Sequence, residues 1–244
     1  MVNKSSGDSY TQTGFNLTNG SPLPSPTNPF GNPTYPGWTS SNGPNWIDYL
    51  ATTYNSSVLQ TYNLAYGGAT ISSELVAPWR DDVLSLGDQI EGLFVPHVDH
   101  SIWKAKNSLF LIWIGVNDIG NSYWNGDWET FHPTLLDEYF RLVDVLYAKG
   151  ARNFVFLDVP PIELSPGTLQ YGEGSVNQER GAIESLNSKL KERVAALKTG
   201  RKGVWAKVFE TSKVFNDIIA TPAALRLEKY GIANVTEYCE AYQK

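Results

Sequence analysis

The feature that most constrains the fold is an alternation of short apolar segments with longer segments of helical periodicity. The apolar segments are rich in β-branched and aromatic residues and are mostly continuous rather than alternating, which is typical of strands buried on both faces of a parallel sheet. The expected strands are 58–64, 107–114, 153–159 and 204–209. Because helices separate them, the sequence predicts an α/β fold, a three-layer α/β/α arrangement around a central, mostly parallel sheet.

Two of the intervening segments have apolar residues at helical spacing. These predicted helices, 134–149 and 178–198, both end before a glycine, Gly150 and Gly200, as helices commonly do. In contrast, residues 19–44 carry repeated Pro, Gly, Ser and Asn without periodicity. That composition predicts a long structured loop within one domain.

Length and composition fit a single globular domain. The 244 residues are 41% hydrophobic and 18% charged, and we expect one domain over 1–244. The single cysteine, Cys239, excludes an internal disulfide. It is either a small buried apolar residue or one half of a disulfide with a segment beyond Lys244.

Charge and hydropathy exclude several classes of partner. The formal net charge is −6, and Lys and Arg are scattered, so no basic stripe is available for nucleic acid. The longest apolar run, 109–116, is far shorter than the roughly 20 residues that a membrane-spanning helix needs, so integral membrane association is not expected. We expect no cofactor and a monomer.

The localisation follows from indirect signals. Residues 1–6 contain no apolar core, so we do not expect them to be a signal peptide. Four Asn-x-Ser/Thr triplets are nevertheless compatible with a secreted glycoprotein, although such triplets also arise by chance. They begin at Asn3, Asn16, Asn55 and Asn234. For the full-length product we expect an extracellular location.

Three polar or glycine-containing segments lie where a strand should end. They are Gly7-Asp8-Ser9-Tyr10, residues 63–70, and Gly115-Val116-Asn117-Asp118. Ligands of open α/β sheets bind at the carboxyl ends of the strands, so all three should face one crevice. Taken singly, each segment is typical of an ordinary turn, a close backbone approach or a helix cap; their combination favours a site.

Ester hydrolysis requires a nucleophile, a base that deprotonates it, and donors directed at the oxygen that becomes negative. Ser9 can present a hydroxyl just beyond a glycine turn. Its own amide, the amide of Gly68 and the side-chain amide of Asn117 are candidate oxyanion donors.

These motifs resemble the first three blocks of the SGNH/GDSL family of serine ester hydrolases, in the order of that family. Residues 149–152, 158–161 and Asn187 are similar to its secreted eukaryotic branch. Residues 37–46 and 123–128 resemble fungal carbohydrate (acetyl) esterases. The resemblance implies Ser9 as nucleophile, with the Ser9 amide, Gly68 and Asn117 as the oxyanion hole.

The chain departs from the family pattern in two places. Family members have an apolar strand directly before Gly-Asp-Ser, whereas residues 1–6 are polar, so the central strand is expected to be missing. The family supplies its base from an Asp-x-x-His segment, and no histidine follows His132. We therefore expect a domain truncated at both ends.

The chain has histidines at two other places that could supply the base. His132 follows Asn117 on what is expected to be the same loop, and is a possible base; the alternative is a helix start with Pro133 at its first position. His97 and His100 flank Asp99 at the opposite end of the sheet, where an exposed loop is the expectation and no metal site is predicted.

Trp124 and Trp128 follow the third block in a polar segment and are candidate substrate-binding residues, the alternative being packing. The resemblance implies an esterase that hydrolyses short-chain acyl esters, acetyl above all, of a small-molecule or oligosaccharide substrate. Two alternatives remain: a non-catalytic truncated homologue that binds carbohydrate, and a lipase acting on longer acyl chains.

Overall fold

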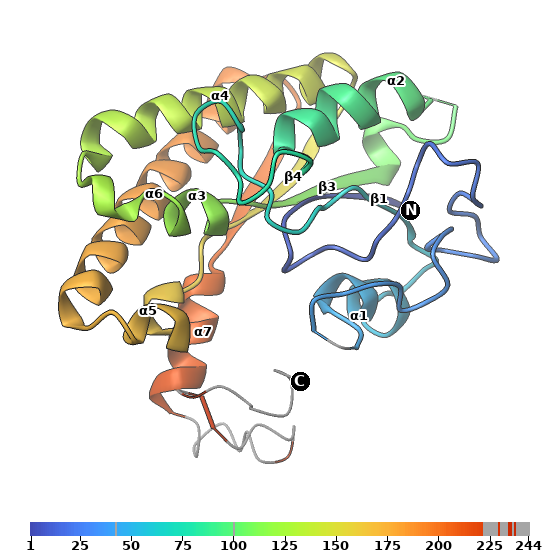
Figure 1. Cartoon of the computed structure of the whole chain (residues 1–244). Helices are drawn as coiled ribbons and strands as arrows, with labels where there is room; N and C mark the ends of the chain where they lie inside the picture. The colour runs from blue at the N-terminus through green and yellow to red at the C-terminus, as the bar shows by residue number, and fades with distance from the viewer. Residues whose placement is uncertain (42, 100, 222–228, 230–233, 236, 238–244) are drawn as a thin grey trace.

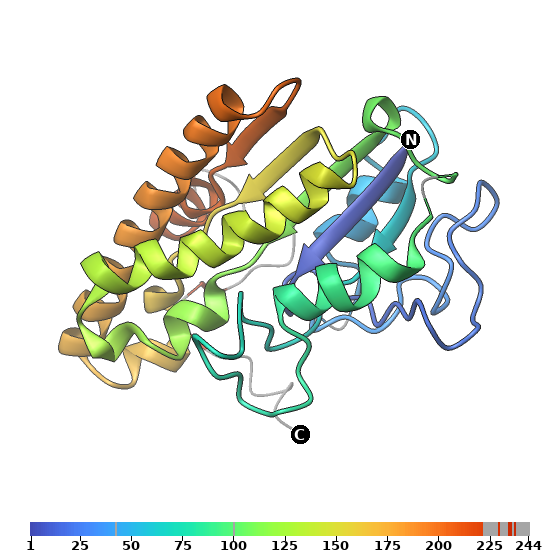
Figure 2. The ribbon, with the colours of Figure 1, turned by 90° about the horizontal axis from the view of Figure 1, so that it is seen from above.

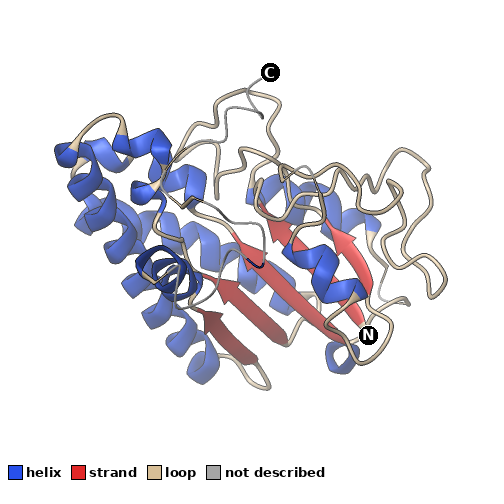
Figure 3. Cartoon of the chain, turned by 90° about the horizontal axis from the view of Figure 1, so that it is seen from below, coloured by secondary structure: helices blue, strands red, loops and turns tan. Residues whose placement is uncertain are grey.

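The computed structural model describes residues 1–41, 43–99, 101–221, 229, 234–235 and 237 (Figure 1). A single five-stranded sheet lies at the centre, with the order β2-β1-β3-β4-β5 and every neighbouring pair parallel (Figure 3). The strands are β1 (Val2–Gly7), β2 (Gln60–Asn63), β3 (Ser108–Trp113), β4 (Asn153–Leu157) and β5 (Trp205–Phe209). The predicted α/β class and the four predicted strands are confirmed.

Helices cover both faces of the sheet. One layer contains η1 (Asp88–Phe94), α2 (Val95–His97), α4 (Trp128–Ala148) and α6 (Glu173–Gly200), which lie side by side above the strands (Figure 2). The helices α1 (Trp46–Thr52) and α7 (Thr211–Ala220) lie on the other side (Figure 1). The arrangement is therefore the predicted three-layer one, and the two predicted helices correspond to α4 and α6.

Shorter helices form the connections between these layers. They are η2 (Ala105–Asn107), α3 (Val116–Gly120), η3 (Tyr123–Asn125), η4 (Ile162–Leu164) and α5 (Pro166–Leu169). The described part of 19–44 contains no helix and only an isolated pair between Ser25 and Asn28, as expected for a loop. None of the helices in the described ranges has both the length and the apolar character needed to cross a membrane.

The prediction that the central strand is missing is wrong. The polar residues Val2–Gly7 form β1, which pairs with β2 on one side and with β3 on the other. Pairing on both sides satisfies the backbone N–H and C=O groups of β1 with hydrogen bonds, whether or not its side chains are apolar. Three polar residues are buried as a result: Asn3, Lys4 and Ser5 are 2%, 4% and 1% exposed.

Lys4 lies in an aromatic cage under η1. Its ammonium nitrogen is 4.7 Å from the ring centre of Trp103, and 5.6 to 5.7 Å from those of Tyr62, Phe110 and Phe94. No described residue offers that nitrogen a hydrogen bond. Burial lowers the pKa of Lys4 from 10.5 to about 7, because the charged form loses its hydration.

Candidate active site

Ser9 lies in a tight turn at the carboxyl end of the central strand. After Gly7 the chain leaves the sheet, and the amides of Thr11 and Gln12 donate to the carbonyl of Asp8 at 3.1 and 3.0 Å. A Cβ on Gly7 would overlap the carbonyl oxygen of Trp113 on β3, and its φ of 155° is rare for other residues. Only glycine therefore allows the turn to start this close to β3.

Gly68 and Asn117 lie next to each other beyond the ends of β2 and β3. The side-chain amide of Asn117, in α3, donates to the carbonyl of Ala69 at 2.9 Å. Gly68 has a φ of +85°, and a Cβ there would overlap the indole nitrogen of Trp79. Ser9 and Gly68 line one cavity, so the three segments predicted to share a crevice converge at this edge of the sheet.

Two of the segments contain a buried carboxyl group, and that of Asp118 connects its segment to 63–70 and the residue after it. Both oxygens of Asp118 lie within 3.3 Å of the amide of Ile71, and Asp8 accepts from the amide of Tyr10 at 3.0 Å. Burial raises the pKa of each to about 7, because neither ionised form is hydrated. The amide hydrogen bonds oppose these shifts, and the charge of Asp118 raises the pKa of Asp8 further.

The cavity beside Ser9 has a volume of about 590 Å³. Its wall includes apolar residues from three segments of the chain, together with two tryptophans whose rings are mostly exposed. These tryptophans are Trp38, at 70% exposure, and Trp79, at 68%. The apolar wall residues are Phe15, Leu17, Leu64, Ala65, Leu84 and Leu93. A cavity of this size and lining lies within the range of typical small-molecule binding sites.

Trp124 and Trp128, the predicted substrate contacts, are not among the residues that line this cavity. The indole nitrogen of Trp128 donates to the carbonyl of Tyr123 at 3.1 Å, and its ring packs where a Cβ on Gly181 of α6 would lie. Trp124 is 56% exposed in η3. The sequence analysis did not single out Trp79, because its segment has no periodicity or motif.

The expectation that His132 lies on the loop of Asn117 is wrong. His132 is inside α4, which begins at Trp128, so Pro133 is also inside the helix and not at its first position. The ring is 1% exposed, and its Nδ1 lies 3.1 Å from the hydroxyl of Ser185 on α6. Burial, followed by the charge of Lys189, lowers its pKa to about 4. Its hydrogen bond is directed at α6, and His132 does not line the cavity of Ser9.

His97 ends α2 and precedes β3, at the opposite end of that strand from Asn117. Across the described ranges, no three His, Cys, Asp or Glu side chains are grouped so as to hold a metal ion. His100 and Cys239 lie outside the described residues.

The later motifs of the chain anchor the loop that follows β4. Asn187 accepts from the amide of Val159 at 2.9 Å and donates to its carbonyl at 2.8 Å. Asp158 accepts from the hydroxyl of Thr211, and from the amide and hydroxyl of Ser212, at the start of α7. These side chains fix the chain at the same edge of the sheet as Ser9.

The fold and the arrangement of these groups are those of a carboxylic ester hydrolase. A hydroxyl stands at the carboxyl edge of a central parallel strand, and backbone and side-chain amides follow the two neighbouring strands. Such amides can stabilise the oxyanion of a tetrahedral intermediate. The chain belongs to the GDSL-like lipase/acylhydrolase family, whose sequence profile matches residues 6–244.

Individual proteins are similar to this chain to different degrees. An acetylesterase of Thermothelomyces thermophilus is 39% identical over 237 residues, which cover 95% of this chain and 76% of that protein. A GDSL esterase/lipase of Arabidopsis thaliana is 27% identical over 190 residues, covering 69% of this chain and 51% of that relative. The crystal structure of a lipolytic G-D-S-L family member from Veillonella parvula DSM 2008 has a TM-score of 0.48 at 13% identity, over 89% of this chain and 82% of that one.

Proposed function

We propose that this chain is a serine esterase that uses Ser9 as its nucleophile. The hydroxyl oxygen of Ser9 attacks the ester carbonyl, the alcohol leaves, and water then cleaves the acyl-enzyme. The amides of Ser9 and Gly68 and the side-chain amide of Asn117 donate hydrogen bonds to the carbonyl oxygen as it becomes negative. The observation that carries this proposal is the shared cavity of Ser9 and Gly68 at the end of β1.

The substrate proposed is a short-chain acyl ester, in particular an acetyl ester, of a sugar or oligosaccharide. The similarity to an acetylesterase favours the acetyl group. Trp38 and Trp79 favour the sugar, because flat, exposed indole rings beside a nucleophile can stack on a pyranose ring.

We further propose that the protein acts outside the cell as a monomeric glycoprotein. Asn16 and Asn234 are exposed, and glycans there would be compatible with the fold. Asn3 is 2% exposed in the central strand, so the folded protein cannot accept a glycan at this position.

Two specific observations favour other functions. A cavity of about 590 Å³ with an apolar wall is larger than an acetyl group needs, which favours a lipase acting on longer acyl chains. Neither of the described histidines, His97 and His132, lines the cavity of Ser9, which favours a carbohydrate-binding protein without turnover. A serine without a base is a weak nucleophile.

The experiment compares hydrolysis of 4-nitrophenyl acetate and 4-nitrophenyl octanoate by this chain, by Ser9→Ala and by the exposed control Ser56→Ala. Turnover of the acetate that is lost only in Ser9→Ala supports the esterase, whereas faster turnover of the octanoate favours the lipase. If neither ester is hydrolysed, the esterase proposal fails. Calorimetric titration with an acetylated xylo-oligosaccharide then tests whether the protein is a binding module.

A further inference from the structure

We infer that Gln89 is a positioning residue for Ser9, and that η1 is anchored on either side of Gln89 so that this side chain can hold the backbone from which the Ser9 turn starts. This inference rests on the role proposed for Ser9. Gln89 itself is not placed in contact with substrate.

The carboxamide of Gln89 brackets the peptide groups of Gly7. Its oxygen accepts from the Gly7 amide at 2.9 Å, and its nitrogen donates to the Gly7 carbonyl at 2.8 Å and to the Leu84 carbonyl at 3.1 Å. The residue is fully buried. One acceptor and two donors are therefore used at once, which fixes the orientation of the carboxamide.

These bonds replace a missing section of the sheet. The pairing between β1 and β2 ends at Ser5 and Asn63, two residues before Gly7. On that side, the carbonyl of Gly7 accepts from the amide of Tyr66 at 3.0 Å, and its amide donates to Gln89. Gln89 thus satisfies a buried backbone amide at the residue where the chain leaves the sheet, two positions before the nucleophile.

Gln89 also connects this turn to the wall of the cavity. Leu84, whose carbonyl accepts the second hydrogen of the carboxamide, lines the cavity beside Ser9. A single side chain therefore sets the position of the strand end relative to one wall of the site.

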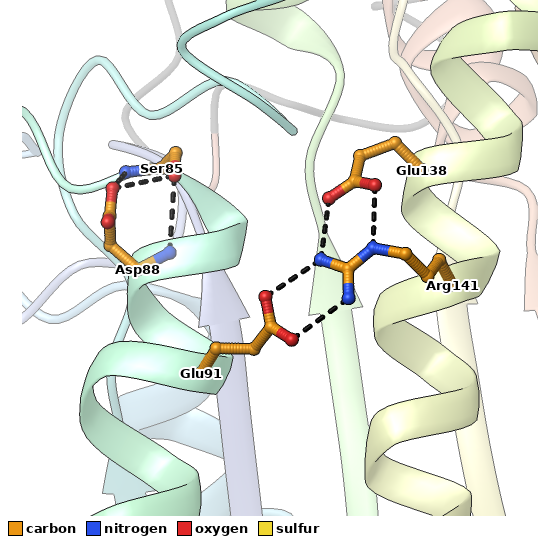
Figure 4. Close-up of polar contacts among 5 residues, drawn as sticks. All are labelled: Ser85, Asp88, Glu91, Glu138 and Arg141. Carbon is orange, nitrogen blue, oxygen red and sulfur yellow. Dashed lines mark hydrogen bonds and ion pairs between the residues drawn. The ribbon is translucent and has the colours of Figure 1, made fainter.

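The helix that carries Gln89 is anchored on either side of it (Figure 4). At its start, Asp88 accepts from the amide and hydroxyl of Ser85 at 2.9 and 2.6 Å, and the Asp88 amide donates back to that hydroxyl. Two residues after Gln89, Glu91 makes two hydrogen bonds with Arg141 of α4, at 2.9 and 2.7 Å. Arg141 makes two more with Glu138. η1 is a π-helix, a rare form that is frequent at functional sites, and these contacts anchor it on either side of Gln89.

The test compares two variants of nearly the same shape. Gln89→Met removes all three hydrogen bonds. Gln89→Glu keeps an acceptor and, when its carboxyl is protonated, regains one donor. Gln170→Met is the matched control, since Gln170 is exposed and bonds only locally to the carbonyl of Gly167.

For 4-nitrophenyl acetate we expect Gln89→Met to lower kcat by roughly 10- to 100-fold, with a much smaller change in KM, because displacement of a nucleophile by about 1 Å acts on the chemical step. The activity of Gln89→Glu relative to the parent should rise as the pH falls. Gln170→Met should match the parent. A loss confined to KM, or parental kcat in both folded variants at position 89, overturns the inference.

Amide exchange of Gly7 and Ser9 in ¹⁵N-labelled protein gives a readout that needs no turnover. Exchange at Gly7 should be faster in Gln89→Met, which loses the acceptor, than in the control and in Gln89→Glu, which keeps it, while amides of α6 keep their parental rates. If the parent does not hydrolyse the ester, the proposed function fails, and the exchange data still decide whether Gln89 holds the turn. Unchanged Gly7 exchange in folded Gln89→Met refutes it. If Gln89→Met does not fold, Gln89→Glu decides: an activity relative to the parent that does not rise as the pH falls overturns the inference.

Discussion

Replacing Lys4 by methionine is expected to stabilise the protein substantially. The two side chains have similar length, and Met places a thioether where the ammonium lies among the four aromatic rings of its cage. The pKa of Lys4 falls from 10.5 to about 7 on folding. At 1.36 kcal/mol per pKa unit, the buried amine lowers the free energy of unfolding by roughly 4 to 5 kcal/mol when the pH is below 7.

The pH dependence has a definite sign. Between pH 7 and 10.5 the folded state binds fewer protons than the unfolded state, because the amine is neutral in the folded protein and still protonated in the unfolded one. The free energy of unfolding of the parent should therefore rise between pH 7 and 10.5 as the unfolded amine also loses its proton. Lys4→Met should remove that rise and should be the more stable protein at pH 7.

Urea unfolding followed by tryptophan fluorescence at pH 7, 8.5 and 10 measures both effects. Lys202→Met is the control, because Lys202 is exposed, and such substitutions usually change stability by less than about 0.5 kcal/mol. We expect a gain of at least about 2 kcal/mol for Lys4→Met at pH 7, since cation–π attraction offsets part of the desolvation. Equal stability of variant and parent at pH 7, or an unchanged slope to pH 10, would refute the reasoning.

Three further predictions concern the site. Gly68→Ala should lower kcat/KM for 4-nitrophenyl acetate by about 10²-fold, because the added Cβ overlaps Trp79. Adding Trp79→Ala should restore part of the rate, and parental kinetics in Gly68→Ala would contradict this prediction. Because the pKa of Asp118 is raised, its contribution to stability is lost as the pH rises from 3.8 to about 7. The free energy of urea unfolding of Asp118→Asn should therefore change less with pH in that range than that of the parent. His132→Gln should keep parental hydrolysis, because its contact is Ser185 on α6, and a loss comparable to that of Ser9→Ala would make it the base.

The other four strands and the two long helices could be predicted because each lies in a segment rich in β-branched and aromatic residues or has a clear helical period. The central strand could not. Its side chains are polar, and what makes it a strand is backbone pairing with β2 and β3 on both sides, a relation between distant segments that leaves no local signal.

The site was predictable to a similar degree. Ser9, Gly68 and Asn117 follow strand ends, and parallel topology alone brings strand ends together. The position of Trp79 depends on the conformation of a segment without periodicity, and Gln89 lies in an unusual helix; neither placement has a local sequence signal. His132 was misplaced because Pro133 suggests a helix start, whereas α4 accommodates that proline one turn further in.

The polar central strand and the site at its end are connected through η1. Phe94 of η1 covers Lys4, and Gln89 of the same helix holds Gly7, so one short helix both covers the buried amine and fixes the strand end. The buried amine of Lys4 is unfavourable beneath η1 because its charged form loses its hydration. The hydrogen bonds at Gly7 and those between Glu91 and Arg141 keep that helix in place. The geometry around Ser9 therefore depends on directional bonds near the carboxyl end of β1, and not on apolar burial along the strand. A strand as polar as β1 can then carry the proposed nucleophile, provided that its last residue is held.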